Sequence, residues 1–68
     1  MAVTSRLQEL RGERDWTQAQ LAKEVGVSRQ TINSIETGRF EPSLSLALKL
    51  AQLFESPVES IFALAEEK

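Results

Sequence analysis

The sequence predicts an all-α domain made of five short helices. Serine or threonine stands at the expected start of each helix, where its side chain can cap free backbone N–H groups. Apolar residues then recur at intervals of three and four, which is the spacing of one face of a helix. Glycine or proline separates the helices. The 68 residues, taken as one domain over 1–68, are enough to bury roughly 60% of the surface that the unfolded chain exposes.

The first helix is expected from about Ser5 to Arg14, with Thr4 or Ser5 as its cap. Leu7, Leu10 and Arg14 fall on one stripe at helical spacing. Gly12 interrupts this helix and weakens it by about 1 kcal/mol relative to alanine.

Residues 17–38 predict two further helices joined by a tight turn. Thr17 caps the first of them, and Gln20, three residues later, completes a capping box. Gly26 suits the left-handed conformation that ends a helix. Ser28 then caps a helix that runs to about residue 37, and a second glycine ends it. This segment is therefore interpreted as a helix-turn-helix.

The fourth helix, Leu44–Phe54 with Ser43 as its cap, is apolar over an arc of about 220°. Its polar strip contains only Ser45, Lys49 and Gln52. A helix of this kind is buried on more than one side. The second side packs either against the other helices or against a partner chain.

The fifth helix is expected over residues 57–62, where Ser56 caps, Pro57 takes the first helical position and Glu59 completes the box. For residues 63–68 the sequence leaves three alternatives: an extension of this helix, a short strand or a frayed end.

The third helix carries an unusual polar face opposite its apolar residues Ile32 and Ile35. This face holds uncharged hydrogen-bonding side chains at the helical spacing i, i+3, i+4 and i+7: Gln30, Asn33, Ser34 and Thr37. Asparagine, serine and threonine are poor helix formers, so a requirement other than helix stability favours them. Glutamine can pair with adenine, and Arg29, just before it, can pair with guanine. The alternative is an ordinary solvated helix face capped by Ser28.

These patterns predict a surface that binds double-stranded DNA. The side chains expected to read bases are Ser28, Arg29, Gln30, Asn33 and Ser34. Those expected to contact phosphate are Gln18, Thr17, Thr37 and Arg39, because the first helix of a helix-turn-helix crosses the DNA backbone. Gln18 is also expected to brace the third helix. Trp16 is expected to pack as a hydrophobic staple before the cap rather than to stack on a base. Glu36 lies at the edge of the apolar side and needs a partner, for which we select Arg11.

The composition argues against other classes of function. The chain has no cysteine and no histidine, which removes thiol nucleophiles, thiolate metal sites and the commonest acid–base group at neutral pH. We therefore expect no enzyme activity, no metal, no cofactor and no small-molecule ligand. No signal-peptide pattern and no apolar run of roughly 18 residues is present, so a cytoplasmic protein without a membrane segment is expected.

The net charge of −2 argues mildly against nucleic acid, but the acidic excess lies in residues 41–68. That segment carries two basic and five acidic side chains, whereas residues 1–40 carry six and five. The expected reading helix therefore lies in the less acidic part of the chain.

The segment TQAQLAKEVGVSRQTINSIETG, followed by PSL and VESIF, resembles the phage-repressor/Cro-like (XRE-type) helix-turn-helix transcriptional regulators. The resemblance covers about residues 5–62 and implies a compact five-helix lambda-repressor-like DNA-binding domain. It also implies a repressor that binds a palindromic operator as a homodimer and associates with the nucleoid when bound. The residues that the resemblance implies for the dimer interface, within a C-terminal segment 57–68, are Val58, Ile61, Phe62 and Leu64. A protein-binding module such as an antitoxin subunit remains the alternative.

Overall fold

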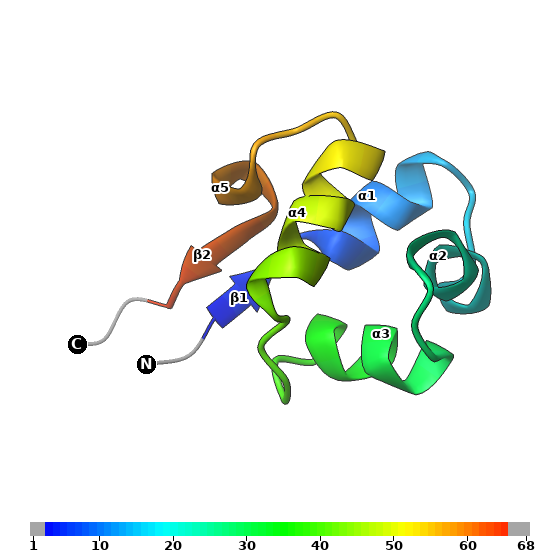
Figure 1. The fold of residues 1–68 in the computed structure, drawn as a ribbon, viewed down its shortest axis with the longest axis horizontal. Helices are drawn as coiled ribbons and strands as arrows, with labels where there is room; N and C mark the ends of the chain where they lie inside the picture. Colours follow the sequence, from blue (N-terminus) through cyan, green and yellow to red (C-terminus); the bar gives the residue numbers. More distant parts are fainter. Residues whose placement is uncertain (1–2, 66–68) are drawn as a thin grey trace.

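The structure, a computed structural model, describes residues 3–65, which form five helices and two short strands. In chain order these are β1 (Val3–Ser5), α1 (Leu7–Glu13), α2 (Gln18–Val25), α3 (Arg29–Glu36), α4 (Leu44–Leu53), α5 (Val58–Ile61) and β2 (Phe62–Leu64). Helix α2 lies at one end of the molecule, and the strands with α5 lie at the other (Figure 1). Between these two ends, α3 lies along the lower edge of the view, below α1 and α4.

The core is built from the apolar stripe of every helix. Its buried side chains are Leu7, Leu21, Ala22, Val25, Ile32, Ile35, Leu46, Leu50, Phe54 and Ile61. Trp16 packs against this cluster, with its ring centroid 6.0 Å from that of Phe54. The Arg14 guanidinium lies over both rings, at 5.3 and 5.0 Å from the centroids. Trp16 therefore has the packing role expected of it.

Three of the expected helix caps are present. The Gln20 N–H donates to Thr17 Oγ1 at 3.1 Å, and the Thr17 N–H donates to Gln20 Oε1 at 2.8 Å, which completes the capping box. Ser28 Oγ accepts from the Thr31 N–H, and Ser43 Oγ accepts from the Leu46 N–H. These caps fix where α2, α3 and α4 begin.

The other two expected caps are wrong. Helix α1 begins after Arg6, which makes no side-chain cap, because Thr4 and Ser5 belong to β1. Helix α5 begins after Pro57, also without a side-chain cap, and the Ser56 hydroxyl donates instead to the Phe54 carbonyl at 3.1 Å. Both helices are shorter than the sequence predicted.

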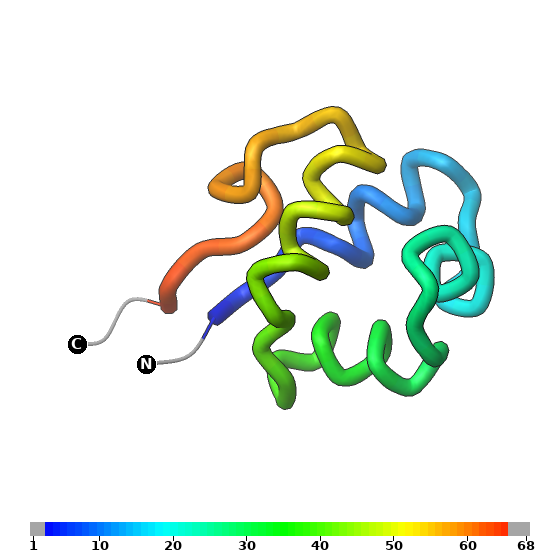
Figure 2. Tube along the Cα trace, in the orientation of Figure 1, coloured from blue at the N-terminus to red at the C-terminus, as the bar shows by residue number. Residues whose placement is uncertain are grey.

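The expectation of an all-α fold is wrong in one respect, because β1 and β2 pair as an antiparallel two-stranded sheet. Val3 lies opposite Leu64, and Ser5 lies opposite Phe62. The two segments run side by side near the ends of the chain (Figure 2). The first residues after α5 therefore form a strand, while residues 66–68 of the expected dimerisation segment lie outside the described residues.

Arg6 joins this sheet to α5. Its backbone N–H donates to the Ile61 carbonyl at 2.8 Å, and its Nη1 donates to the Ser60 carbonyl at 3.2 Å. It also donates to Glu9 at 2.9 Å, and this hydrogen bond lowers the pKa of the exposed Glu9 carboxyl.

Left-handed residues end four of the helices. Gly26 (φ 75°) and Gly38 (φ 78°) do so after α2 and α3, as the sequence predicted. Asp15 (φ 57°) and Glu55 (φ 52°) do the same after α1 and α4 without a glycine. No helix among residues 3–65 is long and apolar enough to cross a membrane.

Candidate nucleic-acid interface

Helices α2 and α3 form the expected helix-turn-helix. The left-handed Gly26 reverses the chain, and the Val27 N–H donates to the Ala22 carbonyl at 3.0 Å. Ile32 and Ile35 are 0% and 2% exposed, so α3 is anchored in the core by one face. Its opposite face is exposed and carries Arg29, Gln30 and Asn33, which are therefore available to a ligand.

Two shallow depressions lie on either side of Gln30. The first, towards α2, is lined by Gln18, Arg29, Gln30 and Asn33. The second, towards the loop after α3, is lined by Ser28, Gln30, Thr31, Ser34 and Phe40. The five residues expected to read bases thus lie on one continuous surface, which we call the reading face: Ser28, Arg29, Gln30, Asn33 and Ser34.

Beneath this surface, Arg11 and Glu36 form the ion pair expected from the sequence. Arg11 Nε donates to Glu36 Oε2 at 2.9 Å, and Arg11 Nη2 donates to Glu36 Oε1 at 3.1 Å. Their side chains are 16% and 4% exposed. The hydrogen bond to Glu36 raises the pKa of the Arg11 guanidinium. Arg11 Nη1 also donates to the Trp16 carbonyl at 2.8 Å, so the pair ties α1, α3 and the segment before α2 together.

Gln18 connects the ion pair to the reading face. Its Nε2 donates to Glu36 Oε1 at 3.0 Å and to Asn33 Oδ1 at 3.2 Å. An amide nitrogen has two hydrogens, so both are used and the side chain has no donor left for a phosphate in this arrangement. The sequence had assigned Gln18 both to a phosphate contact and to bracing the third helix. The two hydrogen bonds to α3 confirm the bracing, and they occupy the donors that the phosphate contact would need.

A phosphate can still be bound at the start of α2 by backbone groups. The first four N–H groups of a helix have no partner within it, and the capping box uses those of Thr17 and Gln20. The N–H groups of Gln18 and Ala19 remain for an external acceptor at the positive end of α2.

The hydrogen bond from Gln18 also fixes what Asn33 offers to a ligand. Because Asn33 Oδ1 accepts, the amide nitrogen points away from Gln18 with two donors. Asn33 therefore suits an acceptor, such as N7 or O6 of guanine, O4 of thymine or a phosphate oxygen.

The other three residues expected to contact phosphate differ in whether their side chains already make hydrogen bonds within the protein. The hydroxyl oxygen of Thr17 serves the cap of α2. The Thr37 hydroxyl donates to the Asn33 carbonyl at 3.0 Å, so its proton serves α3 itself. Arg39 is exposed directly after Gly38.

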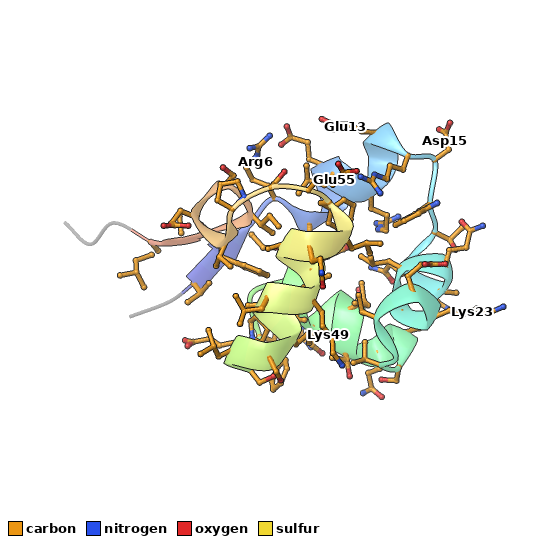
Figure 3. All side chains as sticks on the ribbon, turned by 45° about the horizontal axis from the view of Figure 1, so that its top comes forward. Arg6, Glu13, Asp15, Lys23, Lys49 and Glu55 are labelled. Carbon is orange, nitrogen blue, oxygen red and sulfur yellow. The ribbon has the colours of Figure 1, made fainter. Side chains whose placement is uncertain are left out.

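Two acidic side chains lie at the end of α1, and Figure 3 shows Glu13 and Asp15 projecting at the upper edge of that view. Asp15 also lines a shallow depression together with Gln18 and Arg29, so one carboxylate lies near the edge of the reading face.

The residues expected at a dimer interface do not all lie on the surface. Ile61 is 1% exposed and belongs to the core of its own chain, so it is not available to a partner. Val58 and Phe62 are half-buried, and Leu64 is 63% exposed. On α4, Leu44 and Leu48 are 73% and 53% exposed, so the second apolar side of this helix is not covered by residues 3–65.

The helix-turn-helix family profile matches residues 7–61. The chain belongs to the helix-turn-helix family, in its phage-repressor/Cro-like (XRE-type) branch. It is 45% identical over 66 residues to an uncharacterized HTH-type transcriptional regulator of Archaeoglobus fulgidus, and the match covers 97% of this chain and 93% of the relative. It is 43% identical over 65 residues to the regulator YgzD of Bacillus subtilis, with 96% and 98% covered. The chain is thus a DNA-binding transcriptional regulator by family.

Solved structures of other proteins have the same fold. The restriction-modification controller protein C.AhdI of Aeromonas hydrophila aligns with a TM-score of 0.73 and 33% identity, over 81% of this chain and 83% of that chain. A Bacteroides fragilis protein aligns with a TM-score of 0.78 over 90% of this chain and 98% of that chain. At 24% identity, the second comparison supports the fold alone.

Proposed function

We propose that the protein is a sequence-specific transcriptional repressor that binds a palindromic operator as a homodimer. The observation that carries the proposal is the reading face. It presents Arg29, Gln30 and Asn33 to solvent on a helix whose other face is locked in the core. The hydrogen bonds from Gln18 to Asn33 and Glu36 hold part of it in place before any ligand binds.

Each side chain of the reading face has a distinct task in this proposal. Arg29 and Gln30, in the first turn of α3, read guanine and adenine through bidentate hydrogen bonds in the major groove. Asn33 donates to an acceptor on the next turn. Ser28 and Ser34 make shorter contacts at either end of the face. The start of α2 and Arg39 bind phosphates and set the register of the protein on the duplex.

A homodimer is supported by apolar surface outside the reading face. Cross-strand partners share one face of a sheet, so Val3, Phe62 and Leu64 lie together. A shallow, mostly apolar depression is lined by Val3, Glu59, Phe62, Ala63 and Leu64. In a symmetric dimer this patch meets its own copy, and the proposed interface consists of Val58, Phe62 and Leu64 within the 57–68 segment. Two copies of α3 would then enter successive major grooves about 34 Å apart.

Repression follows from the kind of complex that is proposed. A dimer seated on an operator within a promoter blocks access to the same DNA. The SOS-response transcriptional repressor LexA of Eubacterium rectale supports this sign of regulation, since it aligns with a TM-score of 0.76 and 29% identity. The alignment covers 81% of this chain and 58% of that chain.

Selection of bound duplexes from a random pool, with a mass measurement of the free protein, tests the proposal. We expect an enriched palindrome and the mass of a dimer. Arg29→Ala should cost roughly 1–3 kcal/mol and relax specificity at one base pair. Arg39→Ala, the matched control, should weaken binding to all sequences alike and reduce the salt slope by about 1.

Failure to enrich any duplex at moderate salt would contradict DNA reading. If apolar surface on α4 then captured a protein partner, the exposed Leu44 and Leu48 would support the alternative of a protein-binding module. A reporter gene with the enriched operator across its promoter tests whether the protein represses or activates transcription, because a repressor must lower expression.

A further inference from the structure

Phe40 lies beside the reading face, in the loop that follows α3. It is 48% exposed, and it lines the second depression together with Ser28, Gln30, Thr31 and Ser34. The other four side chains present hydroxyl or amide groups. A large aromatic ring thus borders a surface that is otherwise built for hydrogen bonding.

The backbone holds Phe40 in this place. Gly38 reverses the chain with a φ of 78°. The N–H groups of Arg39 and Phe40 then both donate to the Ser34 carbonyl, at 2.9 and 3.2 Å. Pro42 restricts the residue before it to an extended conformation. The backbone of Phe40 is therefore held against the last turn of α3, and the ring extends from there into the second depression.

The chemistry of the major groove limits what such a ring can contact. Most groups on the edges of base pairs there are hydrogen-bond donors or acceptors, and the C5-methyl group of thymine is the apolar one. Stacking on a base would require the base to leave the helix, and apolar wedges between base pairs are typical of minor-groove binders. An aromatic ring in the loop after α3 can therefore make an apolar contact with the methyl group of a thymine while the base stays stacked.

We propose that Phe40 determines specificity by contacting the methyl group of a thymine, on the loop side of the base pair that Gln30 reads. This inference rests on the proposed DNA-binding function. It adds an apolar contact to a surface whose other expected contacts are hydrogen bonds. The Thr31 side chain is half-buried and lines the same depression. In this proposal its methyl group packs against the thymine methyl group beside the Phe40 ring.

The test uses the full chain and the operator enriched from the random pool. Each thymine is replaced in turn by deoxyuridine, which removes only the methyl group, and binding is titrated by fluorescence anisotropy. We expect one position in each half-site at which the replacement weakens wild-type binding about fourfold, the effect of burying one methyl group. Phe40→Ala should lose this sensitivity, whereas Phe40→Leu should keep most of it.

Two measurements separate this role from a structural one. Leu48→Ala removes an apolar side chain of similar exposure, 53%, from α4, and it should leave the deoxyuridine effect unchanged. The mass and unfolding temperature of Phe40→Ala should match those of the wild type, because the ring lies half outside the fold.

The inference is overturned if the operator is enriched but lacks a thymine at this place. It is also overturned if wild type and Phe40→Ala respond equally to every replacement, or if Phe40→Ala changes the oligomeric state, which would place the ring at a partner contact. In each of these cases DNA binding itself stands. Failure to enrich any duplex removes the proposed function and this inference with it.

Discussion

Replacing Glu36 by glutamine should destabilise the protein strongly. The change keeps the shape of the side chain but removes the charge that faces Arg11 at 2.9 Å, where Glu36 is 4% exposed. Leaving one member of a buried ion pair without its partner costs about 3–5 kcal/mol. Because Arg11 is 16% exposed and the glutamine oxygen still accepts a hydrogen bond, we expect about 3 kcal/mol, near the lower limit of that range.

This loss is large compared with the total stability of the domain. At roughly 0.05–0.15 kcal/mol per residue, a chain of this length has about 3–10 kcal/mol. A loss of about 3 kcal/mol corresponds to a fall of about 12–24 °C in the unfolding temperature of a small domain. Thermal unfolding followed by circular dichroism measures it, at one fixed protein concentration because a dimer makes the midpoint concentration-dependent.

Glu24→Gln is the matched control, since it makes the same chemical change at an exposed position of α2. It should stay within about 0.5 kcal/mol of the wild type. If Glu36→Gln fell in the same range, the argument that the pair is desolvated would be wrong.

A double variant separates stability from function. Arg11→Met with Glu36→Leu replaces the pair by apolar side chains, a change that is often neutral or stabilising. It also removes the acceptor of the hydrogen bond from Gln18. We expect the unfolding temperature to recover to that of the wild type while DNA affinity lies below it. Wild-type values of both would show that Gln18 needs no support from Glu36.

Three further changes test other parts of the structure. Gly12→Ala should stabilise the protein by about 1 kcal/mol, since no atom outside its own helix backbone lies within 4 Å of the Cβ position; a lower unfolding temperature would contradict this. Gln18→Ala should weaken operator binding by about 1 kcal/mol through Asn33, in a titration whose salt slope stays unchanged. Leu64→Ser removes about 1.5–3 kcal/mol from each half of a symmetric interface, so its mass should be that of a monomer, and an unchanged dimer would place the interface elsewhere, for example on α4.

The positions of the candidate site residues in the fold were predicted well where they depend on one helix and less well where they depend on several. The positions of Arg29, Gln30 and Asn33 on the exposed side of α3 follow from the periodicity of that helix. The pairing of Arg11 with Glu36 was predictable because a carboxylate at the edge of the core requires a cation. The sequence predicted that Gln18 braces the third helix, but not that its acceptors are Asn33 and Glu36, because the same side chain could equally have turned towards solvent.

The sequence by itself determined the helices, their order and the family. Caps, left-handed glycines and apolar spacing act within about four residues of the chain, so Thr17, Ser28 and Ser43 could be assigned without any tertiary structure. The periodicity also fixed which face of α3 enters the core.

Only the tertiary structure decided the features that join distant segments. The pairing of β1 with β2 involves strands of three residues, which are too short to show a periodicity of their own. The burial of Ile61 and the place of Phe40 beside Ser34 depend on how separate elements pack. Such contacts are selected by the free energy of the whole fold, so a pattern within a short segment of the sequence does not predict them.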